Sequence, residues 1–172
     1  ENFGEWYTQV ILKSELLDIW LFANCYLCMS TGTGIDFISL INKKPIFFSN
    51  YIPIYYFISF SNSYTSPKKL YWKDSNKELN INAYIKNNFN SSISLDKNAI
   101  ILKELSGKEI LLDLREYLKI IEANTSNSNL PHNKSFFHKL LNSSTKENIK
   151  INFNFLHPKA FISYLWFKRV NK

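Results

Sequence analysis

The stretch that decides the fold is residues 25–50, Cys-Tyr-Leu-Cys-Met-Ser-Thr-Gly-Thr-Gly-Ile-Asp-Phe-Ile-Ser-Leu-Ile-Asn-Lys-Lys-Pro-Ile-Phe-Phe-Ser-Asn. Residues 25–29 are a continuous apolar run, typical of a strand covered on both faces, and residues 30–34 interrupt it with turn-forming side chains. Helical spacing resumes over 35–41. A second buried strand is predicted over 45–49, with proline at its first position, where no ladder donor is lost. The pattern predicts a strand, a loop, a helix and a second strand.

The segments on either side continue this alternation. Residues 15–23 carry apolar side chains at helical spacing, and a further helix is expected over 82–88. Residues 99–103 predict a third strand, whereas the polar residues 61–77 are interpreted as an irregular surface excursion. This order of elements indicates an α/β domain with a parallel sheet.

A long helix is predicted over residues 107–123. Ser106 and Glu109 match the capping box, in which each side chain satisfies a backbone donor near the other. The apolar positions of the segment then keep a period of 3.6 residues.

A Ser- and Asn-rich linker at 124–129 is the clearest boundary in the chain. We therefore expect residues 1–123 to form one α/β domain and 124–172 to form a linker and a helical tail. Short helices are predicted over 135–141 and 158–167. The tail is expected to pack on the domain or on a preceding part of the protein.

Composition limits the classes of function. The 172 residues carry a net charge of +7, and 45% of them are hydrophobic, which excludes disorder throughout. Only Arg115 and Arg169 are arginines and the lysines are scattered, so nucleic-acid binding is not expected. The apolar stretch 46–60 is interrupted by polar residues and falls short of the ~18 residues of a spanning helix, so no transmembrane segment is expected.

Cys25 and Cys28 form a C-x-x-C pair. A redox pair normally opens a helix, but these cysteines lie on a predicted strand, where positions three apart face opposite ways. A zinc site needs further ligands, and His132, His138 and His157 show no matching spacing. We interpret the cysteines as two buried free thiols and expect no metal.

The loop after the first predicted strand has the clearest binding chemistry, because ligands of open α/β sheets bind beyond the carboxyl ends of the strands. Gly32 and Gly34 allow close approach of the backbone, and Ser30, Thr31 and Thr33 offer hydroxyls. The amides that open the next helix favour an anion such as a diphosphate. The pattern matches neither G-x-G-x-x-G nor G-x-x-x-x-G-K-[ST], so a capped turn without a ligand stays open as the alternative.

Two further polar residues are placed near this edge. Asp36 suits a sugar or ribose hydroxyl, although an acidic residue in a first helical turn also stabilises the helix dipole. Asn50 leaves the neighbouring strand at the same edge, where it suits either a bound ligand or an Asx turn.

Residues 16–53 resemble the C-terminal half of a bacterial family of GT-B-fold glycosyltransferases associated with surface-carbohydrate gene clusters. The resemblance rests on a helix with Asp18, a cysteine-containing strand, the Ser/Thr-Gly loop, and Lys44-Pro45 opening a strand that ends in Asn50. Residues 67–70 and 101–122 are also similar, so the likeness covers roughly 16–123.

The resemblance implies a Rossmann-like parallel sheet flanked by helices, one half of a GT-B fold, with a short helical C-terminal tail. Residues 1–123 would bind a nucleotide sugar without a metal or other cofactor, for transfer of its sugar to a surface polysaccharide or another glycan acceptor. The implied donor-binding residues are Ser30, Thr31, Gly32, Thr33, Gly34, Asp36, Asn50 and Tyr51.

The resemblance also implies a missing N-terminal domain, which would supply the acceptor site and often the catalytic base. The chain begins at Glu1 without an initiator methionine, so it is expected to be part of a longer enzyme and inactive alone. The implied location is the cytoplasm or the inner face of the membrane.

The alternative function is a non-catalytic α/β module that docks on a partner protein. It rests on an aromatic set expected to be exposed, namely Tyr51, Tyr55, Tyr56, Phe57, Trp72, Trp166 and Phe167.

Overall fold

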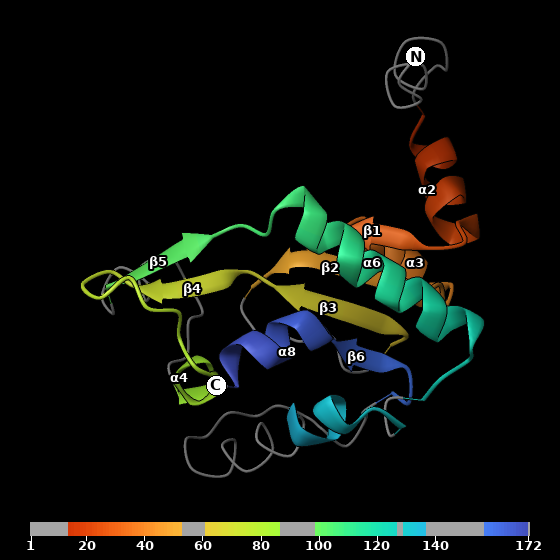
Figure 1. Ribbon diagram of the computed structural model, residues 1–172. Helices are drawn as coiled ribbons and strands as arrows, with labels where there is room; N and C mark the ends of the chain where they lie inside the picture. The colour runs from red at the N-terminus through yellow and green to blue at the C-terminus, as the bar shows by residue number, and fades with distance from the viewer. Residues whose placement is uncertain (1–13, 53–60, 87–98, 127–128, 137–156, 172) are drawn as a thin grey trace.

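The computed structural model describes residues 14–52, 61–86, 99–126, 129–136 and 157–171. Its elements are α2 (Glu15–Asn24), β1 (Cys28–Ser30), α3 (Asp36–Ile41), β2 (Ile46–Tyr51), β3 (Ser63–Pro67), β4 (Lys69–Trp72), α4 (Ile81–Lys86), β5 (Ile100–Lys103), α6 (Gly107–Glu122), β6 (Ala160–Ile162) and α8 (Tyr164–Val170). Four parallel strands form one sheet in the order β1-β2-β3-β6 (Figure 1). The predicted α/β class with a parallel sheet is confirmed.

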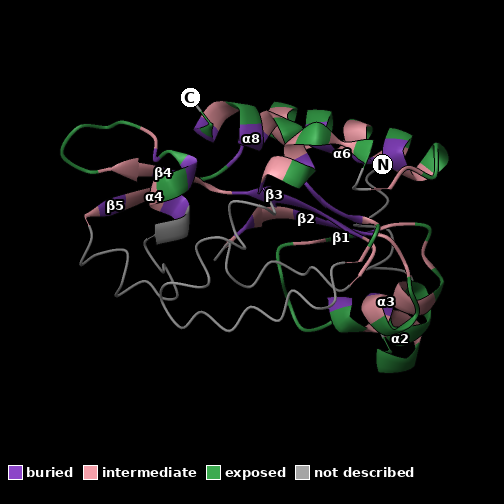
Figure 2. Cartoon of the chain, turned by 90° about the horizontal axis from the view of Figure 1, so that it is seen from below, coloured by how far each residue is buried: buried purple, intermediate pink, exposed green. Residues whose placement is uncertain are grey.

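Helices cover both faces of this sheet. Figure 2 shows α6 and α8 on one face and α2 and α3 on the other. Phe47 of β2 and Tyr64 of β3 are fully buried and pack with Tyr117 of α6. Because the strands are parallel, the loops after β1, β2, β3 and β6 all lie at one edge, which we call the carboxyl edge.

The capping box of α6 is confirmed. The Ser106 hydroxyl accepts a hydrogen bond from the Glu109 amide at 3.4 Å, and the Glu109 carboxylate accepts one from the Ser106 amide at 2.8 Å. The helix begins at Gly107 as expected, and its buried residues lie against the sheet. A local sequence signal was sufficient here because both partners lie within one turn.

The prediction for residues 61–77 is wrong. This polar segment contains β3, whose five residues are all buried between β2 and β6, and then β4. The strand reads Ser-Tyr-Thr-Ser-Pro, so it lacks the apolar run that marks a buried strand. Its hydroxyls are tolerated inside because α6 supplies a buried carboxylate, described below.

The predicted third strand exists, but it belongs to a different sheet. β5 pairs antiparallel with β4, with Lys69 opposite Lys103 and Trp72 opposite Ile100. This two-stranded ribbon extends away from the main sheet in Figure 1. The third strand of the parallel sheet is β3 instead, which pairs with β2 on the side away from β1.

The predicted helix over 158–167 is corrected to a strand followed by a helix. Residues 160–162 form β6 at the edge of the parallel sheet, and α8 begins after Ser163, whose hydroxyl accepts from the Trp166 amide at 3.0 Å. For the predicted helix 135–141, residues 131–136 are helical and 137–141 lie outside the described residues. The C-terminal segment thus adds a strand and a short helix to the same core as β3.

The aromatic set expected at the surface is largely internal. Tyr51, Trp166 and Phe167 are buried and Trp72 is half-buried, while residues 55–57 lie outside the described part. Trp166 is 1% exposed and meets Tyr84 and Phe136 edge-on. The apolar side chains that are exposed lie mainly on or beside α2, β1 and α3, and include Leu16, Ile19, Trp20, Tyr26, Met29, Phe37 and Ile41.

Both cysteines are free thiols. Cys28 is buried, and Cys25 is half-buried with its sulfur 3.7 Å from the Ser39 hydroxyl. Burial raises the pKa of the Cys28 thiol. Among the described residues no helix is long and apolar enough to cross a membrane.

Candidate functional site

The loop that joins β1 to α3 is organised by Ser30. Its hydroxyl donates to the Asp36 carboxylate at 2.6 Å and accepts from the amides of Gly32 and Thr33 at 2.9 and 3.4 Å. One donor and two acceptor positions are all that a serine hydroxyl has. Asp36 is only 2% exposed, so the hydrogen bonds of the Ser30–Asp36 pair hold the loop from its buried side.

Gly32 and Tyr51 form the second contact that holds the loop. Gly32 has φ +92°, and a Cβ on it would lie 3.0 Å from Cε2 of the Tyr51 ring. Tyr51 is buried and its ring lies 5.2 Å from that of Phe48. Burial, with the charge of Asp36, raises the pKa of Tyr51 to about 12, so its hydroxyl stays protonated at neutral pH. The end of β2 therefore supports the loop after β1.

We expect Gly32→Ala to lower the free energy of unfolding by about 1–2 kcal/mol, because an L-residue in this conformation is strained and its Cβ would press on Tyr51. Gly34→Ala is the matched control, since no atom lies within 4 Å of its Cβ position. Urea denaturation of the two variants measures the difference. Equal stabilities would contradict this account of the loop.

The outer part of the loop, residues 31–34, is accessible to solvent. Thr31, Gly32, Thr33 and Gly34 are all exposed, and they follow directly on the carboxyl end of β1. Asn50 (φ +52°) is half-buried, and its side-chain oxygen accepts from the Leu105 amide at 2.7 Å. Asn50 therefore ties the end of β2 to the segment before α6. The structure brings all eight predicted residues to one edge, and four of them form its exposed surface.

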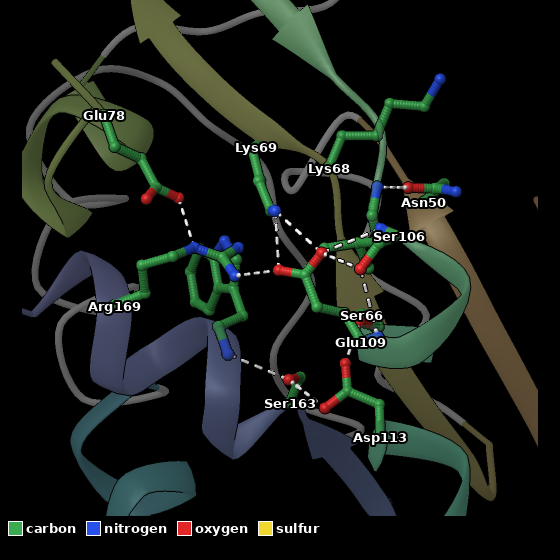
Figure 3. Close-up of polar contacts among 12 residues, drawn as sticks. Asn50, Ser66, Lys68, Lys69, Glu78, Ser106, Glu109, Asp113, Ser163 and Arg169 are labelled. Carbon is green, nitrogen blue, oxygen red and sulfur yellow. Dashed lines mark hydrogen bonds and ion pairs between the residues drawn. The ribbon is translucent and has the colours of Figure 1, made fainter. Parts of the chain in front are cut away.

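Sequence reasoning missed a buried carboxylate at the same edge. Asp113 of α6 is 2% exposed and accepts from the hydroxyls of Ser66 and Ser163, the latter at 2.7 Å (Figure 3). It also accepts from the Tyr64 hydroxyl at 3.4 Å. Burial raises the pKa of Asp113, and the hydroxyl hydrogen bonds oppose that rise. Asp113 joins α6 to β3 and to the end of β6.

An ion-pair network continues from this cluster (Figure 3). Lys69 lies 2.6 Å from the Glu109 carboxylate, while Arg169 of α8 pairs with Glu78 and lies 3.6 Å from Glu109. Burial alone would raise the pKa of Glu109, but hydrogen bonds from Lys69 and Ser106 lower it to about 2. The network holds α6, α8 and β4 together.

The only sequence signal for these groups was the position of Asp113 on the apolar side of α6. An acidic residue three positions after Ile110 and one before Leu114 interrupts the helical apolar stripe. Its hydroxyl partners lie 47 to 50 residues away. No local spacing relates them.

Glu116 provides a prediction of pH dependence. Burial and the nearby charge of Asp113 raise the pKa of Glu116 to about 7. The folded chain therefore binds a proton between about pH 4.5 and 7 that the unfolded chain has lost, so this group adds stability as the pH falls through that window. After allowance for solvent screening, Glu116→Gln is expected to raise the free energy of unfolding at pH 8 by about 1 kcal/mol.

Urea denaturation of wild type and Glu116→Gln at pH 5, 6, 7 and 8 tests this. The gain in stability of the variant should shrink toward pH 5, where the wild-type carboxyl is protonated. Glu122→Gln, at the exposed end of the same helix, controls for loss of a negative charge. A pH-independent difference would be inconsistent with titration of Glu116.

Among the described residues, no three His, Cys, Asp or Glu side chains are grouped so that they could hold a metal ion. Comparison with protein-family models, with curated proteins and with solved structures gave no match.

Proposed function

We propose that the exposed loop at the end of β1 binds the diphosphate of a nucleotide sugar, and that the protein is the donor-binding part of a glycosyltransferase. The observation that carries this proposal is the open loop at residues 31–34, held at the carboxyl edge of a parallel sheet by Gly32 against Tyr51. Loops at this edge are where α/β folds bind their ligands.

The eight predicted residues divide into two roles in this proposal. Ser30, Asp36, Asn50 and Tyr51 are positioning residues, because their polar groups or rings hold the loop and its surroundings. Thr31, Gly32, Thr33 and Gly34 are exposed, and in this proposal the threonine hydroxyls and the loop backbone would meet the diphosphate oxygens. Donors fixed before the ligand arrives stabilise a leaving diphosphate without paying for reorganisation.

The division of roles differs from the direct sugar contacts that resemblance assigned to Asp36 and Asn50. A buried carboxylate that already accepts from Ser30 acts on the ligand through the loop. The proposal places the acceptor site and the general base in a domain outside this chain, and it needs no metal at the loop. The acceptor is a surface polysaccharide or another glycan.

Titration calorimetry with uridine, guanosine and cytidine diphosphates tests the proposal. We expect micromolar binding of at least one of them. Gly34→Asp places a carboxylate in open space at the loop and should abolish binding by repulsion, whereas Gly34→Ala should bind as the wild type does.

Thermal melts of both variants serve as the control for folding. Because no atom lies near the Gly34 Cβ position, both are expected to melt close to the wild type. A folded wild-type chain that binds none of the three nucleotides would refute the proposal. If Gly34→Asp bound the nucleotide as tightly as the wild type, the nucleotide would have to bind at another site.

A second candidate function, docking on a partner, is favoured by the apolar side chains exposed on α2 and α3. Leu16 and Ile41 are each 77% exposed, and Trp20 is 59% exposed. Large apolar patches mark interaction surfaces. Sedimentation equilibrium of wild type and Trp20→Ser tests self-association through this face. A monomer at all concentrations in both chains would count against a second copy as the partner.

A further inference from the structure

A cavity of about 410 Å³ lies at the amino edge of the sheet, opposite the loop described above. Its walls come from the turn after α3 and from the residues that precede β3 and β6. The lining residues are Leu40, Lys43, Ser61, Asn62, His157 and Lys159. The volume suits a small organic ligand.

The polar wall of this cavity is basic. Lys43 and Lys159 carry positive charge, and no acidic side chain is among the described lining residues. His157 accepts a hydrogen bond from the Lys159 amide at its Nδ1 (3.0 Å), so the neutral ring carries its proton on Nε2. Burial and the charge of Lys159 lower the pKa of His157. Two lysines and a histidine thus line one cavity.

Lys43 is held there in an unusual backbone conformation. The amides of Lys43 and Lys44 donate to the carbonyls of Leu40 and Ser39 at 3.0 and 2.9 Å, which is the Schellman pattern at the end of α3. The residue at the left-handed position is normally glycine, yet here it is lysine with φ +56°. Glycine would suit this backbone position better than lysine, so the turn itself does not favour the lysine side chain.

Lys159, another residue of the cavity wall, already has a structural role. Lys159 Nζ donates to Asn124 Oδ1 at 2.6 Å, just beyond the carboxyl end of α6, where a cation is favourable. No ion pair of Lys43 occurs within the described part of the chain. The buried hydroxyl oxygen of Ser61 also has no hydrogen-bond partner there. Among the described residues of this wall, Lys43 is therefore the lysine whose ammonium group no ion pair or side-chain hydrogen bond engages.

We propose that this cavity binds a small molecule through a phosphate group. Lysine ammonium groups are charged donors, which matches the several acceptor oxygens and the double charge of a phosphate monoester. The cavity is larger than a single phosphate ion, so the ligand has an organic part beside the phosphate. The site is independent of the proposed diphosphate loop.

The test is a calorimetric titration of the full chain, first with inorganic phosphate and then, in a separate experiment, with ribose 5-phosphate. We expect ribose 5-phosphate to bind more tightly than inorganic phosphate. Lys43→Gly should weaken the binding of both by about tenfold or more, as expected for loss of a hydrogen bond from a charged group. Lys108→Gln, an exposed change of the same charge on α6, is the control and should leave binding unchanged.

Lys43→Gly also separates binding from folding. Because glycine suits the left-handed position, the melting temperature should stay the same or rise while phosphate affinity falls. Equal weakening by Lys43→Gly and Lys108→Gln would show a general charge effect and overturn the proposal, as would no binding of ribose 5-phosphate to the wild type. Gly34→Asp should leave phosphate binding intact, so failure here is distinguishable from failure of the diphosphate loop.

Discussion

Replacement of Asp113 by alanine is expected to lower the free energy of unfolding by about 3–5 kcal/mol, because it leaves several buried hydroxyls without an acceptor. Ser66, Ser163 and Tyr64 are all buried and all donate to this carboxylate. Each unsatisfied buried group costs about 1–3 kcal/mol. Because the side chains can rearrange in part, the expected loss is smaller than the full cost of three unsatisfied hydroxyls.

Urea denaturation followed by far-ultraviolet circular dichroism measures this loss. Asp113→Asn keeps the shape and one acceptor oxygen, so it should cost less than the alanine variant. Arg115→Ala, on the exposed face of the same helix, is the control and should change stability by no more than about 0.5 kcal/mol. A loss below about 1 kcal/mol for Asp113→Ala would mean that the hydroxyls find other partners.

Trp166→Ala is expected to cost about 3–5 kcal/mol, the usual range for removing a large aromatic side chain from a core. Trp166 is 1% exposed and belongs to the buried cluster that includes Leu70, Tyr84 and Phe136. These residues come from β4, α4, the helical segment 131–136 and α8. The indole therefore joins the C-terminal segment to the ribbon of β4 and β5.

The measurement is a urea titration read by both circular dichroism and tryptophan fluorescence. Coincident transitions in the wild type would show that the C-terminal segment unfolds together with the sheet. Lys168→Ala, exposed on the same helix, is the matched control and should be nearly neutral. If Trp166→Ala left the main transition in place, α8 would not belong to that cooperative unit.

The β1–α3–β2 region was predictable because its signals are local. The apolar run at 45–49, the turn residues at 30–34 and the helical spacing of 35–41 each predict one element without reference to the rest of the chain. The same holds for α6, whose capping pair lies within one turn. Five of the residues proposed to bind the donor, residues 30–34, likewise lie in or beside the loop between two of these adjacent elements.

The errors share a different cause. β3 is polar, β6 has three residues, and neither has a periodic pattern long enough to stand out. β3 becomes a central strand because β2 and β6 pair with it and because Asp113 satisfies its Ser66 hydroxyl. The basic cavity is equally non-local, since Lys43, Ser61 and His157 meet only when three strand starts lie side by side.

The sequence by itself thus determined the elements with local signals, namely the strand β2, the helices α2, α3 and α6, and the turn at Gly32. The strand expected over 25–29 is shifted, because β1 begins at Cys28 and ends at Ser30. Tertiary structure alone decided the order of the four-stranded sheet, the burial of a polar strand and the two clusters of charged groups. The physical reason is distance along the chain. Caps and periodicity act within a few residues. A buried hydroxyl such as that of Ser66, by contrast, needs a hydrogen-bond partner, and its partner Asp113 lies 47 residues further along the chain.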